Sequence, residues 1–559
     1  MKPALRKPGA AREDTRRAAR APADRKSFVM PLAAVTTMLA LLTVVIQRHT
    51  LQAFFALDDL VMFQQAAGVR ASPLTLWRWL SGNLWFRIVV PIWGHEPFPY
   101  HATSLALHVL NVLLLHRLAR RWGASNMAAF VGAALFGMSR LHFPALLAAT
   151  SIGELMSLTF TLIALLVAGA GARMALAAGA LVLAVSAKES VMLVPFAAAL
   201  VTPAGESVRS RLRALWPLLA TGVVAGGVLL ASGVLSSRLG GEAYAVSFGS
   251  NLLENVARLF GWTVDWQDPI PDLHATTSGA AHLVLPLLAV VLTALAFRKR
   301  SGGLLRVGAA WWWLAVLPVL PLPGRTYLHY LYVPLAGVAL VVAALWDAVL
   351  RWRAGRAVPN SSDGRARWAV AAAVVLAAGL WTDVLLSTRM DLRMPNVDWP
   401  LDPVLRKSEI ARRGIGDVRT ALAGERARVL ILIPAAISSD IDLGTGRVSA
   451  NTPIKRYALE AVLDDGRSLR AQVANAESVT FVHDYVAGHD GWRCFLSRSD
   501  SHLVPLGEVP AAHARYIEAM LASGLNAAAL DYATKALADR PDDTALRALY
   551  EQALAAAPR

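Results

Sequence analysis

The sequence contains a single cysteine, Cys494, among 559 residues. One thiol cannot form an intramolecular disulfide or supply a cysteine-based metal site, so both are excluded. Charged residues are scarce as well, at 17%, against about a quarter in soluble domains. The chain also lacks a nucleotide-binding glycine loop, a Ser-His-Asp arrangement and the ligand spacing of a zinc site. The low charge is typical of a membrane protein.

Basic residues outnumber acidic ones, 55 against 39, which gives a formal net charge of +16. They gather between apolar runs, which is the pattern of cytoplasmic loops that face anionic lipid. We therefore expect membrane lipids as partners and no nucleic acid. Residues 1–26 form a basic tail with little apolar surface, for which we expect a disordered cytoplasmic segment.

Apolar runs that can cross a bilayer recur along the first 390 residues. The first, at 27–47, is too long for a signal-peptide core and lacks a clear cleavage site, so we expect an uncleaved anchor. Further runs lie at 101–119, 126–143, 151–171, 174–187, 190–203, 214–234, 281–297, 304–320, 327–349 and 368–388. The stretch 174–203 allows one long helix or two short ones. Two helices keep three Arg/Lys clusters cytoplasmic, so the sequence predicts about eleven membrane-spanning helices, with the N-terminus inside.

The long loops and the tail after Ser387 are predicted to lie outside the cytoplasm. Loops 48–100 and 236–280 are rich in tryptophan, which favours helices in the membrane interface. Apolar runs at 429–433 and 478–482 alternate with Gly and Asp turns and predict a small β-rich domain. Helical patterns from Ala511 onward, broken at 523–526 and 540–543, resemble a short stretch of tetratricopeptide repeat. The expected domains are a basic tail (1–26), an all-α polytopic transmembrane domain (27–390), an extracytoplasmic α/β or β-rich domain (391–507) and a tetratricopeptide-like helical tail (508–559).

Two adjacent acids, Asp58 and Asp59, follow the first predicted span and are flanked by aromatic and aliphatic residues. A carboxylate that is partly desolvated in this way can act as a general base and activate an acceptor hydroxyl. Alternatively, either acid could simply start a helix that runs from Leu60 to Ala67.

Lys188 falls in a very short turn between two predicted helices of about 14 residues, which reach about 21 Å, less than the hydrocarbon core. We expect it below the outer surface in a protein-lined cavity, where a cation is a functional candidate and a lipid phosphate is a natural partner. The alternative is an internal pair with Glu154 or Glu189. Glu154 lies at the start of the fourth predicted span. It either interacts favourably with the helix dipole there or is an acid in the cavity. Arg325 either binds phosphate bidentately or anchors the chain at the interface.

His101 and His108 lie on one face of the second span. A histidine pair can bind metal, but two ligands do not make a site, and ordinary hydrogen-bonded helix histidines are favoured. Polar residues of the second outer loop either line an acceptor groove or are simply solvated: Asp265, Asp268, Asp272 and His274.

Taken together, these residues resemble the GT-C membrane glycosyltransferases, especially the protein-mannosyltransferase-like branch with a tetratricopeptide-bearing tail. The resemblance covers roughly residues 30–390, and the sequence departs from it at Ser104, where relatives often carry Asn, and in the near absence of a repeat array. It rests on five loose motifs in the right order, FALDDLVMFQQA, PFPYHATSLALHVLNVLLLHRLARR, AALFGMSRLHFPALLAATSIGELMSL, SAKESVMLVPF and GRTYLHYLYVPLAGVAL.

The resemblance implies an inverting enzyme that moves a mannosyl or other hexosyl group from a polyprenyl-phosphate donor to a protein or glycan acceptor. Asp58 would be the base, with Asp59 as its catalytic neighbour. The substrate-binding residues would be Lys188, Arg325, Glu154 and His101. No cofactor is required, although related enzymes differ in their use of a divalent metal.

The expected location is the inner (plasma) membrane, with transfer on the extracytoplasmic side. The rival hypothesis is a non-catalytic membrane scaffold whose tail binds a partner in the cell envelope. A transporter is less favoured, because charged residues are scarce at mid-helix.

Overall fold

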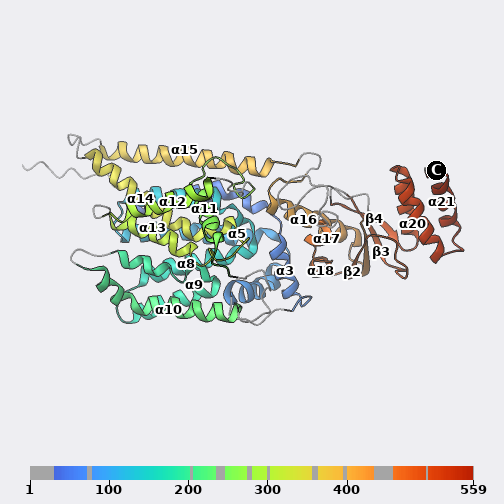
Figure 1. Ribbon diagram of the computed structural model, residues 1–559, viewed down its shortest axis with the longest axis horizontal. Helices are drawn as coiled ribbons and strands as arrows, with labels where there is room; N and C mark the ends of the chain where they lie inside the picture. Colours follow the sequence, from blue (N-terminus) through green and yellow to red (C-terminus); the bar gives the residue numbers. More distant parts are fainter. Residues whose placement is uncertain are drawn as a thin grey trace, which may run out of the picture.

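The structure is a computed structural model, which describes residues 30–71, 78–201, 206–234, 246–273, 280–298, 302–354, 363–394, 399–433, 458–498 and 501–557. His274 and the basic tail 1–26 lie outside these ranges. A bundle of helices comes first, a four-stranded sheet with short helices lies at one end of it, and three further helices lie beyond the sheet (Figure 1).

The N-terminal half of the bundle consists of short and long helices in alternation. Its elements are α2 (Leu32–Gln47), η1 (Arg48–Gln52), α3 (Leu57–Ala66), η2 (Trp79–Leu84), α4 (Trp85–Trp93), α5 (Pro97–Arg121), α6 (Asn126–Met138), η3 (Arg140–His142), α7 (Phe143–Leu147), η4 (Ala149–Ser151), α8 (Ile152–Val167), α9 (Ala172–Ala187), η5 (Glu189–Val191) and η6 (Val194–Leu200). The second half consists of α10 (Val208–Val234), α11 (Ser250–Val264), α12 (Ala281–Ala296), α13 (Gly303–Val316), η8 (Leu328–Leu331), α14 (Tyr332–Ala354) and α15 (Asp363–Asp391).

Five helical segments of the described chain are long and apolar enough to cross a membrane, or six if the bent pair of α6 with η3 and α7 counts as one span. Their number indicates a multi-pass membrane protein. Four more of the expected runs form shorter apolar helices, and the run at 214–234 lies within α10. At 1.5 Å per residue, a 16-residue helix such as α9 reaches about 24 Å, which is less than the thickness of the hydrocarbon core.

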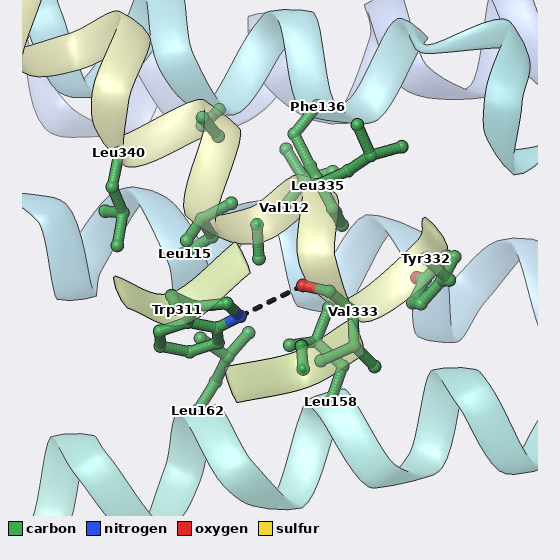
Figure 2. Packing of buried hydrophobic residues seen from close by; sticks show 14 of the residues in the cluster. Val112, Leu115, Phe136, Leu158, Leu162, Trp311, Tyr332, Val333, Leu335 and Leu340 are labelled. Carbon is green, nitrogen blue, oxygen red and sulfur yellow. Dashed lines mark hydrogen bonds between the residues drawn. The ribbon is translucent and has the colours of Figure 1, made fainter. Parts of the chain in front are cut away.

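Glycines allow the central helices of the bundle to approach each other closely. A Cβ atom on Gly308 of α13 would lie 2.5 Å from the carbonyl oxygen of Gly337 in α14, and one on Gly132 of α6 would lie 2.4 Å from that of Ala339. Trp311 fills the space beside this crossing, and its indole N–H donates to the carbonyl of Val333 over 3.0 Å (Figure 2). Such small-residue contacts are typical of helices packed within a membrane.

The chain breaks at Lys188, within the predicted turn at 186–190. Lys188 has extended backbone angles (φ −158°, ψ 130°) directly after α9. The run that follows forms the 3₁₀ helices η5 and η6 instead of the predicted α-helix, with Pro195 near the start of η6. The predicted break at Lys188 is thus confirmed. The second segment is not the predicted α-helix, and neither segment is among the helices long enough to cross a membrane.

The unit after the bundle is mixed rather than β-rich. It contains α16 (Pro403–Leu422), β1 (Ala427–Leu432), α17 (Ala458–Val462), α18 (Arg467–Gln472), β2 (Ala476–Val482), β3 (Arg493–Ser497) and β4 (Leu503–Glu508). The strand order is β2-β1-β3-β4, and β1 is parallel to both of its neighbours, while β3 and β4 are antiparallel. Parallel strands need crossover connections, and α17 and α18 lie in the one between β1 and β2.

Three helices complete the chain, namely α19 (Ala511–Ala522), α20 (Asn526–Asp539) and α21 (Thr544–Ala556). Their breaks fall at the two predicted positions. The mixed unit contacts the bundle through α3, where the Gln64 amide donates to the Ser468 hydroxyl over 2.9 Å. Arg70 and Asp464 form an ion pair at 3.4 Å beside this contact.

Candidate functional site

The two adjacent acids of α3 have different environments. Asp58 is exposed, whereas Asp59 is fully buried. The carboxylate of Asp59 accepts three hydrogen bonds, from the backbone N–H of Ala56 (2.9 Å) and from the backbone N–H and hydroxyl of Thr150 (2.7 and 2.8 Å). Burial raises the pKa of Asp59 to about 6, although these donors oppose the shift. The Asp59 carboxylate thus caps the first turn of α3 and ties it to η4. Ala56 takes the N-cap position, which the alternative interpretation gave to one of the two acids.

Asp58 faces the unit that follows the bundle. Burial lowers the pKa of Lys407 in α16, and the nearby carboxylate of Asp58 opposes this shift. The exposed acid therefore lies where the helix bundle meets α16, and Lys407 is its cationic neighbour. Sequence reasoning missed Lys407, because the pair brings together residues that lie more than 340 positions apart in the chain.

Lys188 is buried and pairs with Glu154, one of the two predicted partners. Its ammonium lies 2.6 Å from a carboxylate oxygen of Glu154, and the two side chains are 9% and 1% exposed. The same ammonium lies over the ring of Tyr330 in η8, 5.1 Å from its centroid. A buried cation is costly unless paired, so Glu154 and the Tyr330 ring together stabilise Lys188 at this depth.

A second ion pair lies beside the first. Arg78 donates to both carboxylate oxygens of Glu189, at 3.2 and 2.8 Å. The hydroxyl of Ser81 in the π-helical η2 donates to the carbonyl of Ala187 over 2.7 Å. These contacts hold the segment around Arg78 and η2 against the break at Lys188.

The predicted site residues come together through the start of α8. Asp59 binds Thr150 in η4, and Glu154 follows one turn later at the beginning of α8, where it binds Lys188. The acid pair and Lys188 therefore lie at the same end of α8. Arg325 is half-buried in the loop that leads into η8, the element that places Tyr330 over Lys188.

The histidines of α5 are buried parts of the packing. His108 is hydrogen-bonded on both sides of its ring, to the Tyr332 hydroxyl (2.8 Å) and the Gly137 carbonyl (3.0 Å). Asn111, one turn along α5, donates to the same hydroxyl over 3.1 Å. His101 is also fully buried, and its ring lies 6.3 Å from that of Phe55. The described residues contain no group of three or more His, Cys, Asp or Glu side chains that could hold a metal ion.

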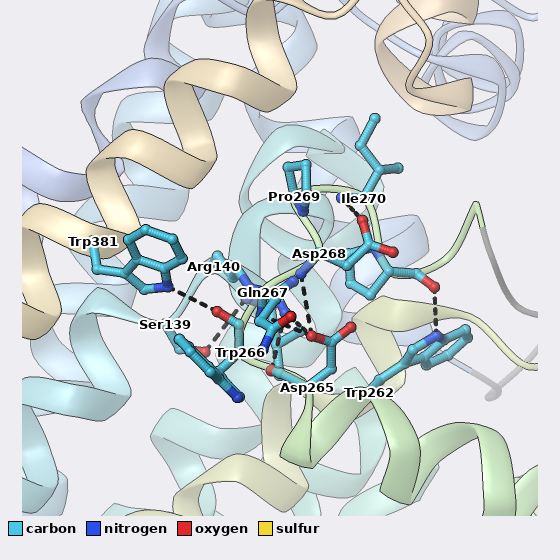
Figure 3. A network of polar contacts seen from close by, with 12 residues as sticks. Ser139, Arg140, Trp262, Asp265, Trp266, Gln267, Asp268, Pro269, Ile270 and Trp381 are labelled. Atoms are coloured by element: carbon cyan, nitrogen blue, oxygen red, sulfur yellow. Dashed lines mark hydrogen bonds and ion pairs between the residues drawn. The ribbon is translucent and has the colours of Figure 1, made fainter. Parts of the chain in front are cut away.

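The acids of the loop after α11 that the structure describes take part in internal contacts. Asp265 pairs with the buried Arg140 at 3.3 Å, and its carboxylate accepts the backbone N–H of Gln267 over 2.8 Å (Figure 3). Asp268 in turn accepts the backbone N–H of Ile270 over 2.9 Å. Both acids therefore fold the loop back on itself.

Arg389, near the end of α15, is the centre of a buried charge cluster that the sequence did not indicate. Its guanidinium donates to Asp402 over 2.6 Å and contacts Asp272 at 3.4 Å. Arg389 and Asp402 are both fully buried. The cluster joins the last helix of the bundle, the loop after α11 and the beginning of α16. A charged residue at the end of an apolar run was its only signal in the sequence.

No family model, curated protein or solved structure matches the chain. The resemblance to the GT-C enzymes therefore rests on the sequence motifs alone.

Proposed function

We propose that the chain is a GT-C-type membrane glycosyltransferase that moves a sugar from a polyprenyl-phosphate donor to an acceptor hydroxyl. The proposal rests on the different environments of the two adjacent acids, Asp58 and Asp59. Asp59 is buried and held by three hydrogen bonds, whereas Asp58 is exposed at the junction of the bundle and α16. An exposed carboxylate on a fixed helix start can reach an acceptor hydroxyl and act as a general base.

In this proposal the acceptor hydroxyl gives its proton to the carboxylate of Asp58 as its oxygen attacks the anomeric carbon of the sugar. The bond between that carbon and the phosphate oxygen breaks, and the electron pair leaves with the lipid phosphate. Attack opposite to the leaving group inverts the anomeric centre. Lys188 and Arg325 would stabilise the departing phosphate, which competes with Glu154 for the Lys188 ammonium. His101 stays in the proposed site only as a buried residue that shapes its wall.

Membrane spans and an acid at the junction with the C-terminal unit also support the proposed location. A lipid-linked donor would approach from the bundle, and an acceptor from the side of α16. We place both at the outer face of the inner (plasma) membrane, with the N-terminus in the cytoplasm.

The test is transfer from a polyprenyl-phosphate sugar in membranes that contain the Asp58→Asn variant. Asparagine keeps the size of the side chain but cannot take up the proton, so transfer should fall by about two to four powers of ten at a normal protein level. Asp391→Asn, which changes an exposed acid at the end of α15, is the matched control and should keep full activity. If the Asp58→Asn variant transfers sugar at the wild-type rate, Asp58 is not the base. If the wild-type chain itself transfers no sugar, the scaffold hypothesis is favoured instead.

A further inference from the structure

A cavity of about 200 Å³ lies between the end of the bundle and α16. Its walls come from the segment after η1, from the end of α15 and from one face of α16. The charged residues that line it are Arg393, Glu409, Arg412 and Arg413. Among the described residues of the lining, three arginines and one glutamate give a formal charge of +2. Phe54, Met390 and Leu405 form an apolar wall on the same cavity.

The arginines of α16 are arranged around a single carboxylate. Arg412 donates to both oxygens of Glu409, at 2.9 and 2.6 Å, and Arg413 donates to one of them at 2.9 Å. The Glu409 carboxylate therefore orients both guanidinium groups. Guanidinium groups bind phosphate through paired N–H donors, so a cavity lined by several arginines favours an anion.

The position of the cavity decides which anion it would meet. Two candidate membrane spans, 32–52 and 364–391, end beside the cavity. Gln52 at the end of the first span and Met390 at the end of the second both line its wall. The ends of spans lie at the depth of the lipid head groups. An anionic group that is attached to an apolar chain fits both the basic and the apolar walls.

We propose that this cavity binds the phosphate of an anionic lipid head group, and that the bound lipid links the bundle to α16. The ligand chemistry is a phosphate ester, with Arg393, Arg412 and Arg413 as donors and the apolar wall against the glycerol and the upper acyl chain. This site is separate from Lys188, and the proposal does not depend on the transferase activity.

The test is lipid binding to the full chain, delipidated in detergent and titrated by native mass spectrometry. Dioleoyl-phosphatidylglycerol should bind more tightly than dioleoyl-phosphatidylcholine. Each of Arg412→Gln and Arg413→Gln should weaken phosphatidylglycerol binding about fivefold, from the electrostatic contribution of one cation near a lipid surface. Glu409→Gln should strengthen it, because it removes a negative charge from the lining, and this opposite sign separates a binding role from a structural one.

Arg467→Gln is the matched control. Like Arg412, Arg467 is an exposed arginine paired with a carboxylate three residues earlier, Asp464, in the same unit. It lies outside the cavity lining and should leave lipid binding unchanged. Equal weakening by Arg467→Gln, or equal binding of the two lipids, would overturn the proposal. Binding of inorganic phosphate with no preference for phosphatidylglycerol would also overturn it, in favour of a site for free phosphate.

Discussion

Asp59→Asn is expected to change how the stability of the protein depends on pH. Burial raises the pKa of the Asp59 carboxyl from 3.8 to about 6 in the folded protein. Between about pH 4 and pH 6 the folded chain therefore holds a proton that the unfolded chain has lost. The stabilisation from this proton is fully present below pH 4 and is lost as the pH rises through 6. This difference in pKa between the folded and unfolded protein corresponds to about 3 kcal/mol in the free energy of unfolding.

The variant carries a neutral amide at every pH, so it lacks this dependence. Its amide oxygen can still accept from Thr150, but its NH₂ group then faces the backbone N–H of Ala56, donor against donor. A buried donor without an acceptor costs about 1–3 kcal/mol. The variant should thus be less stable than the wild type at pH 4. At pH 7 the wild type bears the buried charge. The free energy of unfolding of the wild type, relative to that of the variant, should therefore be about 3 kcal/mol lower than at pH 4.

Chemical denaturation in detergent micelles at pH 4, 5, 6 and 7 measures this difference. Other titrating groups are common to both proteins, so their contributions cancel when the two free energies of unfolding are subtracted. Asp58→Asn is the control, because it removes the neighbouring exposed carboxyl from the same turn of α3. A difference between wild type and Asp59→Asn that stays constant from pH 4 to pH 7 would refute the reasoning.

Two further predictions concern the interior of the bundle, and denaturation in micelles checks both. Gly308→Ala is expected to cost about 1–3 kcal/mol, because its Cβ would lie 2.5 Å from the carbonyl oxygen of Gly337. Gly179→Ala, with no atom within 4 Å of the new Cβ, should be neutral or stabilise α9 by up to about 1 kcal/mol. Lys188→Met should cost about 3–5 kcal/mol by leaving the Glu154 charge buried and unpaired, and adding Glu154→Gln should recover most of it. Equal effects of the two alanine variants, or no recovery in the double variant, would contradict these contacts.

The parts of the fold that depend on local pattern could be predicted from the sequence. Apolar runs gave the positions of the helices, because a bilayer requires long uninterrupted apolar segments. The break at Lys188 was visible as a polar turn within such a run. The strands around Val429 and Val479 and the helix breaks near Gly524 and Pro541 were readable because turn residues interrupt regular patterns there.

Contacts between distant segments could not be predicted in the same way. Asp59 meets Thr150, 91 residues later, and a sequence pattern gives no measure of such a pairing. The sequence allowed either Glu154 or Glu189 as the partner of Lys188, and only the fold assigns Glu154 to it and Glu189 to Arg78. The parallel pairing of β1 was missed because the crossover helices α17 and α18 are too short to show a clear period.

The helix that carries Asp58 is held from two sides. Asp59 ties its first turn to Thr150 of the bundle, and Gln64 ties its last turn to Ser468 of the C-terminal unit. Lys407 of α16 lies beside the exposed carboxylate itself. The position of Asp58 is therefore set jointly by the bundle and by the docking of α16 and α18. If Asp58 acts as a base, its reach toward an acceptor depends on a unit whose sequence lies more than 340 residues away.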